Sequence, residues 1–278
     1  MTSVRVALIQ LRTPANQAAA LAQAEPLIRQ AAAEGGQLIA TPEGSNLLQR
    51  DRAKLFEAAR SLDEDEFVQR LRNLASSLSV SVLIGSALVK RDDGLMANRS
   101  VLIDADGRIQ ATYDKIHMFD VDLPTGDRYR ESSLYAPGDQ AAIAHTPWGA
   151  IGLTICYDMR FPHLYRALAK AGAQMTAIPA AFTRPTGEAH WEVLLRARAI
   201  ETATFVLAPA QGGVHEDGRG TWGHSMVVNP WGEIIAQIDG DEPGVVMANL
   251  DLQEVDRARA AIPALVNDRE FAAPESAR

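Results

Sequence analysis

The sequence predicts an α/β protein in which two mixed sheets pack on each other and helices cover their outer faces. Short apolar runs rich in β-branched residues alternate with longer segments of helical periodicity along the 278 residues. Turn signals between some of these runs, such as Asp106-Gly107, indicate hairpins in addition to strand–helix units. So many strands would crowd one open sheet, and two packed sheets with outer helices are the more economical arrangement.

The first third of the chain reads as alternating strands and helices. In order, it predicts a strand at 4–11, a helix at 16–34, a strand at 37–41, a helix at 63–77 and a strand at 81–90. Gly35-Gly36 ends the first helix, because glycine favours the conformation in which helices commonly stop. Leu71, Leu74 and Leu78 share one face of the second helix, as expected of a helix packed on a core.

The rest of the chain adds hairpins and further helices. In order, it predicts a hairpin at 100–113, a hairpin at 141–155, a helix at 161–171, a strand at 175–179, a helix at 188–202, a strand at 204–209, a hairpin at 226–238, a strand at 245–250 and a helix at 251–261. Asp251 is the expected N-cap of the last helix. Residues 117–140 form a long polar connection, and connections of this length are often functional.

We expect a single domain at 1–270, followed by a loose tail at 271–278. No linker-like or low-complexity segment interrupts the pattern before the tail. Hydrophobic residues make up 47% of the chain and charged residues 22%, so a large buried core is expected and disorder is not.

Composition excludes several classes of function. The net charge of −8 would repel a polyanion, so we expect no nucleic-acid binding and no binding to acidic membrane surfaces. No stretch approaches the ~20 apolar residues of a membrane span, and the run at 4–11 is too short for a secretory signal. These features predict a cytoplasmic protein. The single cysteine rules out an intrachain disulfide.

Three reactive side chains follow predicted strands. Glu43 follows the strand at 37–41, Lys115 follows the second strand of the 100–113 hairpin, and Cys156 follows the strand that ends at Ile155. In α/β folds, catalytic groups gather at the carboxyl ends of strands. The sequence therefore predicts that these three side chains share a site.

The three residue types fit nucleophilic catalysis. A cysteine near the start of a helix is expected to have a lowered pKa, and Glu43 is expected to act as its base if burial raises the carboxyl pKa. Lys115 would donate to a developing oxyanion, which is worth roughly 3 to 4 kcal/mol for one well-placed donor. Each residue also has a simpler interpretation: a buried structural Cys156, a surface or helix-capping Glu43, and a Lys115 that reaches solvent.

Three separated segments resemble the nitrilase superfamily of carbon–nitrogen hydrolases. They are 38–43, 113–119 and 152–162, the last of which reads GLTICYDMRFP. The resemblance implies a Glu–Lys–Cys triad of Glu43, Lys115 and Cys156, with Glu131 as a second glutamate that holds the lysine. It also implies an αββα sandwich, in which two mixed sheets lie between outer helix layers.

Further segments narrow the resemblance to the Nit-type amidase branch. They are 156–162, 186–202 and 223–232, and they are most similar to deaminated glutathione amidases. The ω-amidases, which act on α-ketoglutaramate and α-ketosuccinamate, are a similar alternative, as is another aliphatic amidase or nitrilase of the superfamily. Gly44-Ser45-Asn46 departs from many relatives, which place a bulkier residue after the glutamate, and this leaves the identity of the substrate open.

The branch implies a mechanism and a pocket. A small-molecule amide would form a thioester with Cys156, without a cofactor or a metal, in a homodimer or higher homo-oligomer. The backbone N–H of Tyr157 would help to bind the oxyanion. Arg160 would bind a substrate carboxylate, although a salt bridge to Asp158 or another acid is an equal alternative. Phe182 and Thr186 are further candidates for the pocket.

Three competing functions have weaker support. A papain-like protease would pair Cys156 with a downstream histidine such as His190. A metal enzyme would use His117, His190, His215 or His224, but no two of these show metal-ligand spacing. A binding module without activity would not need all four motif residues. Thiol alkylation separates these classes, because a nucleophile is expected to react faster than a free thiol.

Overall fold

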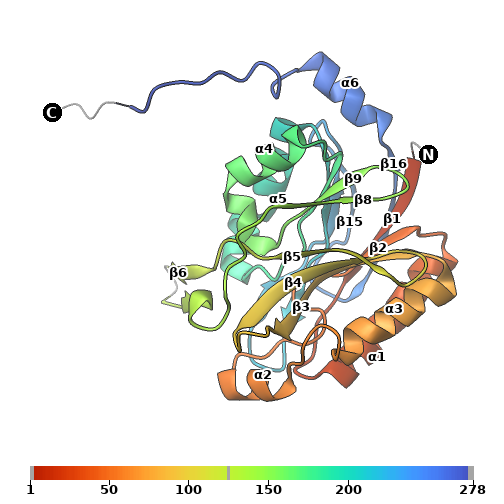
Figure 1. Ribbon diagram of the computed structural model, residues 1–278, viewed down its shortest axis with the longest axis vertical. Coiled ribbons are helices and arrows are strands. Elements are labelled where there is room, and N and C mark those ends of the chain that lie inside the picture. The colour runs from red at the N-terminus through yellow and green to blue at the C-terminus, as the bar shows by residue number, and fades with distance from the viewer. Residues whose placement is uncertain (1–2, 124–125, 275–278) are drawn as a thin grey trace.

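Two six-stranded mixed sheets, packed face to face, form the centre of the protein in a computed structural model that describes residues 3–123 and 126–274 (Figure 1). The first sheet has the order β16 (Gly244–Asp251), β1 (Ser3–Gln10), β2 (Leu38–Ala40), β3 (Ser81–Lys90), β4 (Met96–Ile103) and β5 (Ile109–Asp114). The second has the order β15 (Ile234–Gln237), β14 (Met226–Val228), β11 (Phe205–Ala208), β10 (Met175–Ala177), β9 (Ala150–Leu153) and β8 (Ala142–His145).

Parallel strands occupy the middle of both sheets. Strands β1, β2 and β3 run parallel in the first sheet, and β9, β10 and β11 run parallel in the second. Strand β4 is antiparallel to both β3 and β5, so β5 ends at the same edge as β2. This arrangement puts the residues that follow β2, β5, β9 and β10 where a site can form.

Helices cover the outer face of each sheet, which confirms the predicted αββα layering (Figure 1). Helices α1 (Gln17–Ala33) and α3 (Glu66–Leu78) lie on the first sheet, and α4 (Pro162–Lys170) and α5 (Arg184–Thr202) lie on the second. Each helix presents a buried face, such as Leu71 and Leu74 of α3. Burial of these faces against the sheets is the main source of helix stability.

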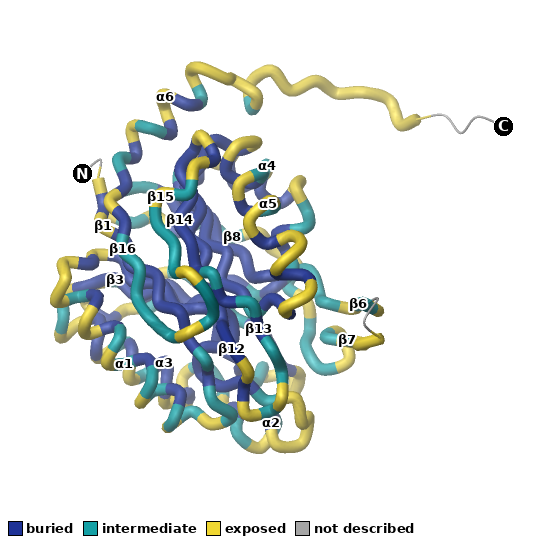
Figure 2. Tube along the Cα trace, turned by 180° about the vertical axis from the view of Figure 1, so that it is seen from behind, coloured by how far each residue is buried: buried dark blue, intermediate teal, exposed yellow. Residues whose placement is uncertain are grey.

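The strands of the first sheet divide their side chains between two cores. Leu8 of β1 packs in the cluster between the sheets, together with Leu153 of β9, whereas Ala7 and Ile9 pack against the α1 and α3 side. This is the period of two that a strand buried on both faces requires. Figure 2 shows the resulting dark-blue centre, with exposed residues mainly on helix surfaces, loops, β6, β7 and the C-terminal segment.

The connections contain short elements that periodicity did not reveal. The predicted polar connection 117–140 holds β6 (Asp120–Asp122), β7 (Arg128–Arg130) and a 3₁₀ turn, η1 (Glu131–Ser133). Further such elements are α2 (Arg52–Ala58), β12 (Gly212–Val214), β13 (Gly220–Trp222) and a second 3₁₀ turn, η2 (Cys156–Arg160). Each has seven residues or fewer, which is too short for a periodic pattern to be distinctive.

Three predicted helix starts are wrong. Helix α3 begins at Glu66 rather than at 63, because Asp65 is its N-cap and accepts from the Val68 N–H. Helix α5 begins at Arg184 rather than at 188, because Pro185 is suited to a first turn and Gly187 avoids a clash with Trp222, whose Cβ lies 2.3 Å from where a Gly187 Cβ would be. Helix α6 (Gln253–Ala261) has Leu252 at its N-cap position, since Asp251 is still the last residue of β16.

The C-terminal segment leaves the body after α6. Residues 263–274 are mostly exposed and run away from the sheets in Figure 1. Residues 271–274 of the predicted tail are described, and 275–278 lie outside the described residues. Across the described ranges, no helix is both long enough and apolar enough to cross a membrane.

Candidate active site

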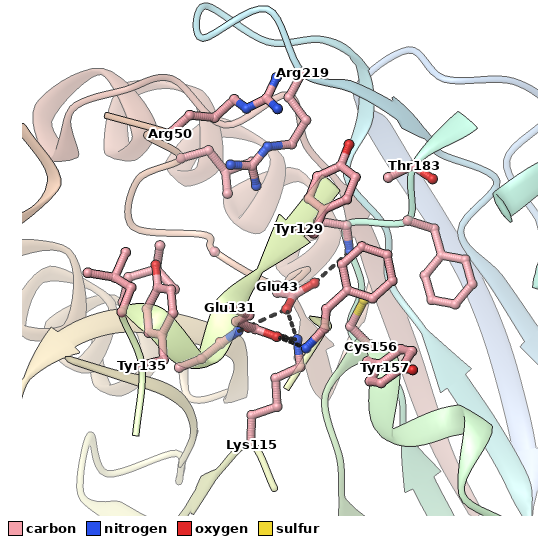
Figure 3. A pocket seen from close by; sticks show the side chains of 18 of the residues that line it. Glu43, Arg50, Lys115, Tyr129, Glu131, Tyr135, Cys156, Tyr157, Thr183 and Arg219 are labelled. Carbon is pink, nitrogen blue, oxygen red and sulfur yellow. Dashed lines mark hydrogen bonds and ion pairs between the residues drawn. The ribbon is translucent and has the colours of Figure 1, made fainter. Parts of the chain in front are cut away.

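The predicted site residues line one cavity of about 270 Å³ between the ends of the two sheets. Glu43 follows β2, Lys115 follows β5 and Cys156 follows β9, as the strand pattern predicts. Glu131 enters from the 117–140 connection, at the start of η1. Figure 3 shows these four side chains pointing toward one another.

Lys115 lies between two carboxylates. Its Nζ donates to Glu43 Oε1 at 3.0 Å and to both carboxylate oxygens of Glu131 at 2.9 Å. The lysine is 2% exposed, so the alternative of a lysine that reaches solvent is wrong. Glu43 is also buried, at 7% exposure, which excludes a surface carboxylate.

Both carboxylates are fixed by further donors. The Phe119 N–H donates to Glu131 Oε2 at 2.6 Å, and the Ala181 N–H donates to Glu43 Oε2 at 2.9 Å. Asn98 Nδ2 joins the two acids, at 2.9 Å from Glu43 and 3.3 Å from Glu131. With this many donors, the carboxylates have defined positions relative to the ammonium.

The Cys156 thiol and the Glu43 carboxylate line the same cavity, close enough that each group shifts the pKa of the other. Cys156 opens η2 in a left-handed conformation, φ +50°, which is unusual for a residue with a side chain and is a form of strain often found at functional sites. Its N–H donates to Pro179 O at 2.9 Å, which ties the turn to the end of β10. The sulfur therefore faces the acid rather than aliphatic side chains alone.

Asp158 holds the turn that carries the nucleophile. Its Oδ2 accepts from the Tyr113 hydroxyl at 2.7 Å and from the Ile155 N–H at 2.9 Å, and its Oδ1 accepts from the His117 N–H at 3.0 Å. The His117 ring Nδ1 lies 2.7 Å from the same Oδ1. This buried carboxylate links the strand that precedes Lys115 to the turn that begins with Cys156.

Gly85 of β3 lies where strand ends from the two sheets approach each other. A Cβ there would be 2.0 Å from the carbonyl oxygen of Thr41 and 2.4 Å from the Cβ of Pro179. Thr41 stands two residues before Glu43 in the chain, and Pro179 accepts the Cys156 N–H. Only glycine allows this close approach.

The charges of the site differ from the sequence-based expectation. Burial raises the pKa of the Cys156 thiol well above its usual value, and the Glu43 charge raises it further. Burial alone would raise the pKa of Glu43, but the Lys115 charge and the hydrogen bonds to it hold that pKa below its usual value. The predicted lowered cysteine pKa and raised glutamate pKa are both wrong, because burial and the Glu43 charge act on the thiol, whereas the Lys115 charge and hydrogen bonds outweigh burial at Glu43.

Lys115 keeps its positive charge. Burial alone would lower its pKa, but the charges of Glu131 and Glu43 raise it well above the usual lysine value. The resting site therefore holds a neutral thiol, an ionised Glu43 and an ammonium group.

The four predicted pocket residues line the same cavity. Tyr157 and Arg160 come from η2, and Phe182 and Thr186 come from the segment after β10. The Arg160 guanidinium lies 5.9 Å from the Tyr157 ring centre and 5.5 Å from that of Phe182. Its Nη2 lies 3.2 Å from His190 Nδ1, whereas Asp158 is occupied by other donors. The alternative of an Arg160–Asp158 salt bridge is therefore wrong, because these two described residues form no ion pair.

Two competing site arrangements lack support. His190 contacts Arg160 on the protein surface, and the charged groups that act on the Cys156 thiol are Glu43 and Lys115, which is unlike a cysteine–histidine pair. In 3–123 and 126–274, no group of three or more His, Cys, Asp or Glu side chains is placed to hold a metal ion.

Several lining residues were not predicted. Asn98 lies near the start of β4, and because β4 is antiparallel, that start lies at the edge where β2 and β5 end. The available signal was a polar run, Asn98-Arg99-Ser100, at the start of the predicted hairpin. Others, such as Arg50, Tyr135 and Arg219, come from connections, and Tyr129 belongs to β7.

Comparisons with known proteins agree with this geometry. A family model described as carbon-nitrogen hydrolase matches residues 5–260. Deaminated glutathione amidase of Yersinia enterocolitica is 42% identical over 97% of this chain and 94% of its own length. Omega-amidase of Homo sapiens is 37% identical over 95% of this chain and 94% of its own. The crystal structure of the C. elegans NitFhit protein matches 97% of this chain with a TM-score of 0.90 and 34% identity, and this chain spans 66% of that longer one.

Proposed function

Because this chain belongs to the carbon–nitrogen hydrolase family, we propose that it hydrolyses a small, carboxylate-bearing amide of the deaminated glutathione type through a thioester on Cys156. It is a hydrolase of carbon–nitrogen bonds other than peptide bonds. One observation carries the proposed mechanism: in one cavity, the Lys115 ammonium lies between Glu43 and Glu131, and the Cys156 thiol lies beside Glu43, close enough for its charge to raise the thiol pKa.

The first half-reaction forms the thioester. As Sγ of Cys156 attacks the amide carbonyl, its proton moves to the Glu43 carboxylate, which lies beside the thiol in the same cavity. The carbonyl oxygen becomes an oxyanion, and the Lys115 ammonium and the Tyr157 N–H would stabilise it. The carbon–nitrogen bond then breaks, and Glu43 returns the proton to the departing nitrogen.

The second half-reaction releases the acid. Water attacks the thioester carbonyl, and Glu43 takes a proton from it. The carbon–sulfur bond breaks, the thiolate regains the proton from Glu43, and the product leaves as a carboxylic acid. In both halves Glu131 would keep Lys115 protonated and in position, which the two 2.9 Å contacts support.

Arg160 is the proposed ligand for a carboxylate on the acyl side of the amide. It follows the nucleophile on η2, lies against the rings of Tyr157 and Phe182, and has no carboxylate partner among the described residues. An arginine packed near two rings has restricted freedom, and its planar guanidinium suits a two-point contact with a carboxylate. Thr186 lines the same cavity.

An ω-amidase is the second candidate, supported by the 37% identity to the human omega-amidase. The two candidates differ in the leaving group, which is ammonia for an ω-amidase and a larger amine for a deaminated glutathione amidase. We also propose a cytoplasmic enzyme that acts as a homodimer or a higher homo-oligomer.

Replacement of the nucleophile tests the mechanism. Cys156→Ala and Cys156→Ser are each expected to lower the turnover of deaminated glutathione by at least ~1,000-fold, because no other nucleophile can form the acyl-enzyme. Mass spectrometry of the rapidly quenched wild-type enzyme is expected to find the acyl group on Cys156. Full activity in Cys156→Ala, with an unchanged melting temperature, would refute the covalent mechanism.

A further inference from the structure

The cavity is unusually rich in arginine for a chain of net charge −8. Its described lining includes two acids, Glu43 and Glu131, which Lys115 joins. The other charged lining residues are five arginines: Arg50, Arg128, Arg130, Arg160 and Arg219. A positive potential in a partly closed cavity favours an anionic ligand more strongly than the same charges on an open surface.

Two of these arginines have no strong partner of their own. Arg128 and Arg130 pair with Asp122, at 3.5 and 2.9 Å, and Arg160 already has a proposed ligand. Arg50 contacts the ring of Tyr129, at 6.0 Å from its centre, and among the described residues it has no carboxylate partner.

Arg219 is only partly satisfied. Its Nη2 lies 3.3 Å from Asp217, and its buried Nε has no hydrogen-bond acceptor within the described residues. An unsatisfied buried donor costs free energy that an added acceptor would recover.

Arg50 and Arg219 lie at the end of the cavity away from the nucleophile. Arg50 comes from the segment before α2, and Arg219 comes from the turn between β12 and β13. Figure 3 shows both guanidinium groups beyond Tyr129, apart from Lys115 and Cys156. Arg160 belongs to η2, next to the nucleophile. The cavity thus has cationic groups in two regions that different elements supply.

We propose that Arg50 and Arg219 form a second anion subsite, which binds a carboxylate on the amine side of the scissile amide. This inference rests on the proposed function and deepens it, because it selects a substrate class. The preferred substrate would have an anionic group on each side of the amide bond, and ammonia would be a poor match for the leaving-group side. Deaminated glutathione has this character, with one carboxylate in its acyl part and one on its terminal glycine.

A pair of substrates that differ in one charge tests the subsite. The pair is deaminated glutathione and its derivative with the glycine carboxylate converted to a carboxamide. Wild-type kcat/KM is expected to be roughly 10- to 100-fold higher for the carboxylate, mainly through KM, because charge-assisted hydrogen bonds are lost in the derivative. Arg50→Gln with Arg219→Gln is expected to remove most of this preference and to leave the carboxamide within about twofold of wild type.

Controls keep the outcomes distinct. Arg50→Gln alone changes an exposed residue and is expected to give part of the effect without a folding defect. Arg52→Gln, an exposed neighbour outside the cavity lining, is expected to behave as wild type. Equal loss for both substrates in the arginine variants, or no wild-type preference, would overturn the subsite while the amidase function stands. No turnover of either amide by the wild type would overturn the proposed function and the subsite with it.

Discussion

At the scale of single residues, the resting thiol of Cys156 is neutral and depends on Glu43 for its reactivity. Burial and the Glu43 charge raise its pKa, while Lys115 lowers it. Transfer of the proton therefore has to accompany attack on the substrate, instead of preceding it. A thiol with a raised pKa is expected to react with solutes such as iodoacetamide more slowly than a free thiol, which reverses the expectation of fast alkylation drawn from the sequence.

Glu43→Gln separates turnover from thiol ionisation. Turnover is expected to fall at least ~100-fold because the base is lost. The pH profile of iodoacetamide alkylation is expected to move to lower pH, because the variant loses a negative neighbour of the thiol and keeps Lys115. Alkylation rates against pH measure this shift, with the exposed Glu57→Gln as a control. An alkylation profile at the same or higher pH would contradict the charge assignment.

The charge of Glu43 also predicts how the kcat/KM of the wild-type enzyme depends on pH at low pH. Glu43 must be ionised to act, and its pKa lies below the usual value. The profile of kcat/KM is thus expected to stay flat as the pH falls through neutrality and to decline only below about pH 4.3, the ordinary glutamate range.

At the scale of elements, η2 is positioned by Asp158 rather than by its own short hydrogen-bond pattern. The buried carboxylate accepts from Tyr113, His117 and Ile155, which belong to two different sheets and their connections. It therefore couples the placement of Cys156 to the strand that leads to Lys115.

Asp158→Asn is expected to destabilise the protein by roughly 2 to 3 kcal/mol, since an amide cannot accept from all of these donors. It is expected to lower kcat more than it raises KM, because Asp158 positions the nucleophile and does not line the cavity. Tyr113→Phe removes one of the bonds and is expected to cost about 1 kcal/mol. Chemical denaturation and steady-state kinetics measure both, and wild-type kcat in Asp158→Asn would exclude the positioning role.

Long periodic elements and strand ends could be predicted from the sequence. Strand β3 has the predicted limits, and Glu43, Lys115 and Cys156 follow strands as expected. The features that the sequence did not predict depend on tertiary contacts. The first turn of α5 contains Gly187, which a local pattern disfavours and the packing of Trp222 requires. The pKa values of Cys156 and Glu43 depend on distances between remote segments, which no local pattern contains.

At the scale of the whole molecule, the site is divided between the two sheets. Glu43, Asn98 and Lys115 belong to or follow strands of the first sheet, and Cys156 and Ala181 follow strands of the second. The apolar cluster between the sheets therefore sets the position of the base relative to the nucleophile. The assignment of 1–270 to one domain stays a prediction, and the family match spans 5–260 of it.

Leu8→Ala tests the role of this cluster. Leu8 is fully buried between the sheets, and its truncation is expected to cost about 2 to 5 kcal/mol. Leu95→Ala, at a side chain that is 49% exposed, is expected to stay within about 0.5 kcal/mol of wild type. Urea denaturation measures both. A loss below about 1 kcal/mol in Leu8→Ala would mean that the two sheets are held together mainly by other contacts.

The close approach at Gly85 has a consequence for how this catalyst can change. A Cβ added at Gly85 would meet atoms of Thr41 and Pro179. Thr41 stands two residues before the base Glu43, and Pro179 accepts the N–H of the nucleophile Cys156. The distance between the Cys156 thiol and the Glu43 carboxylate therefore depends on the absence of a side chain at Gly85. One methyl group added at Gly85 would push the base and the nucleophile apart. A descendant of this protein with alanine there could therefore keep the fold and lose the activity.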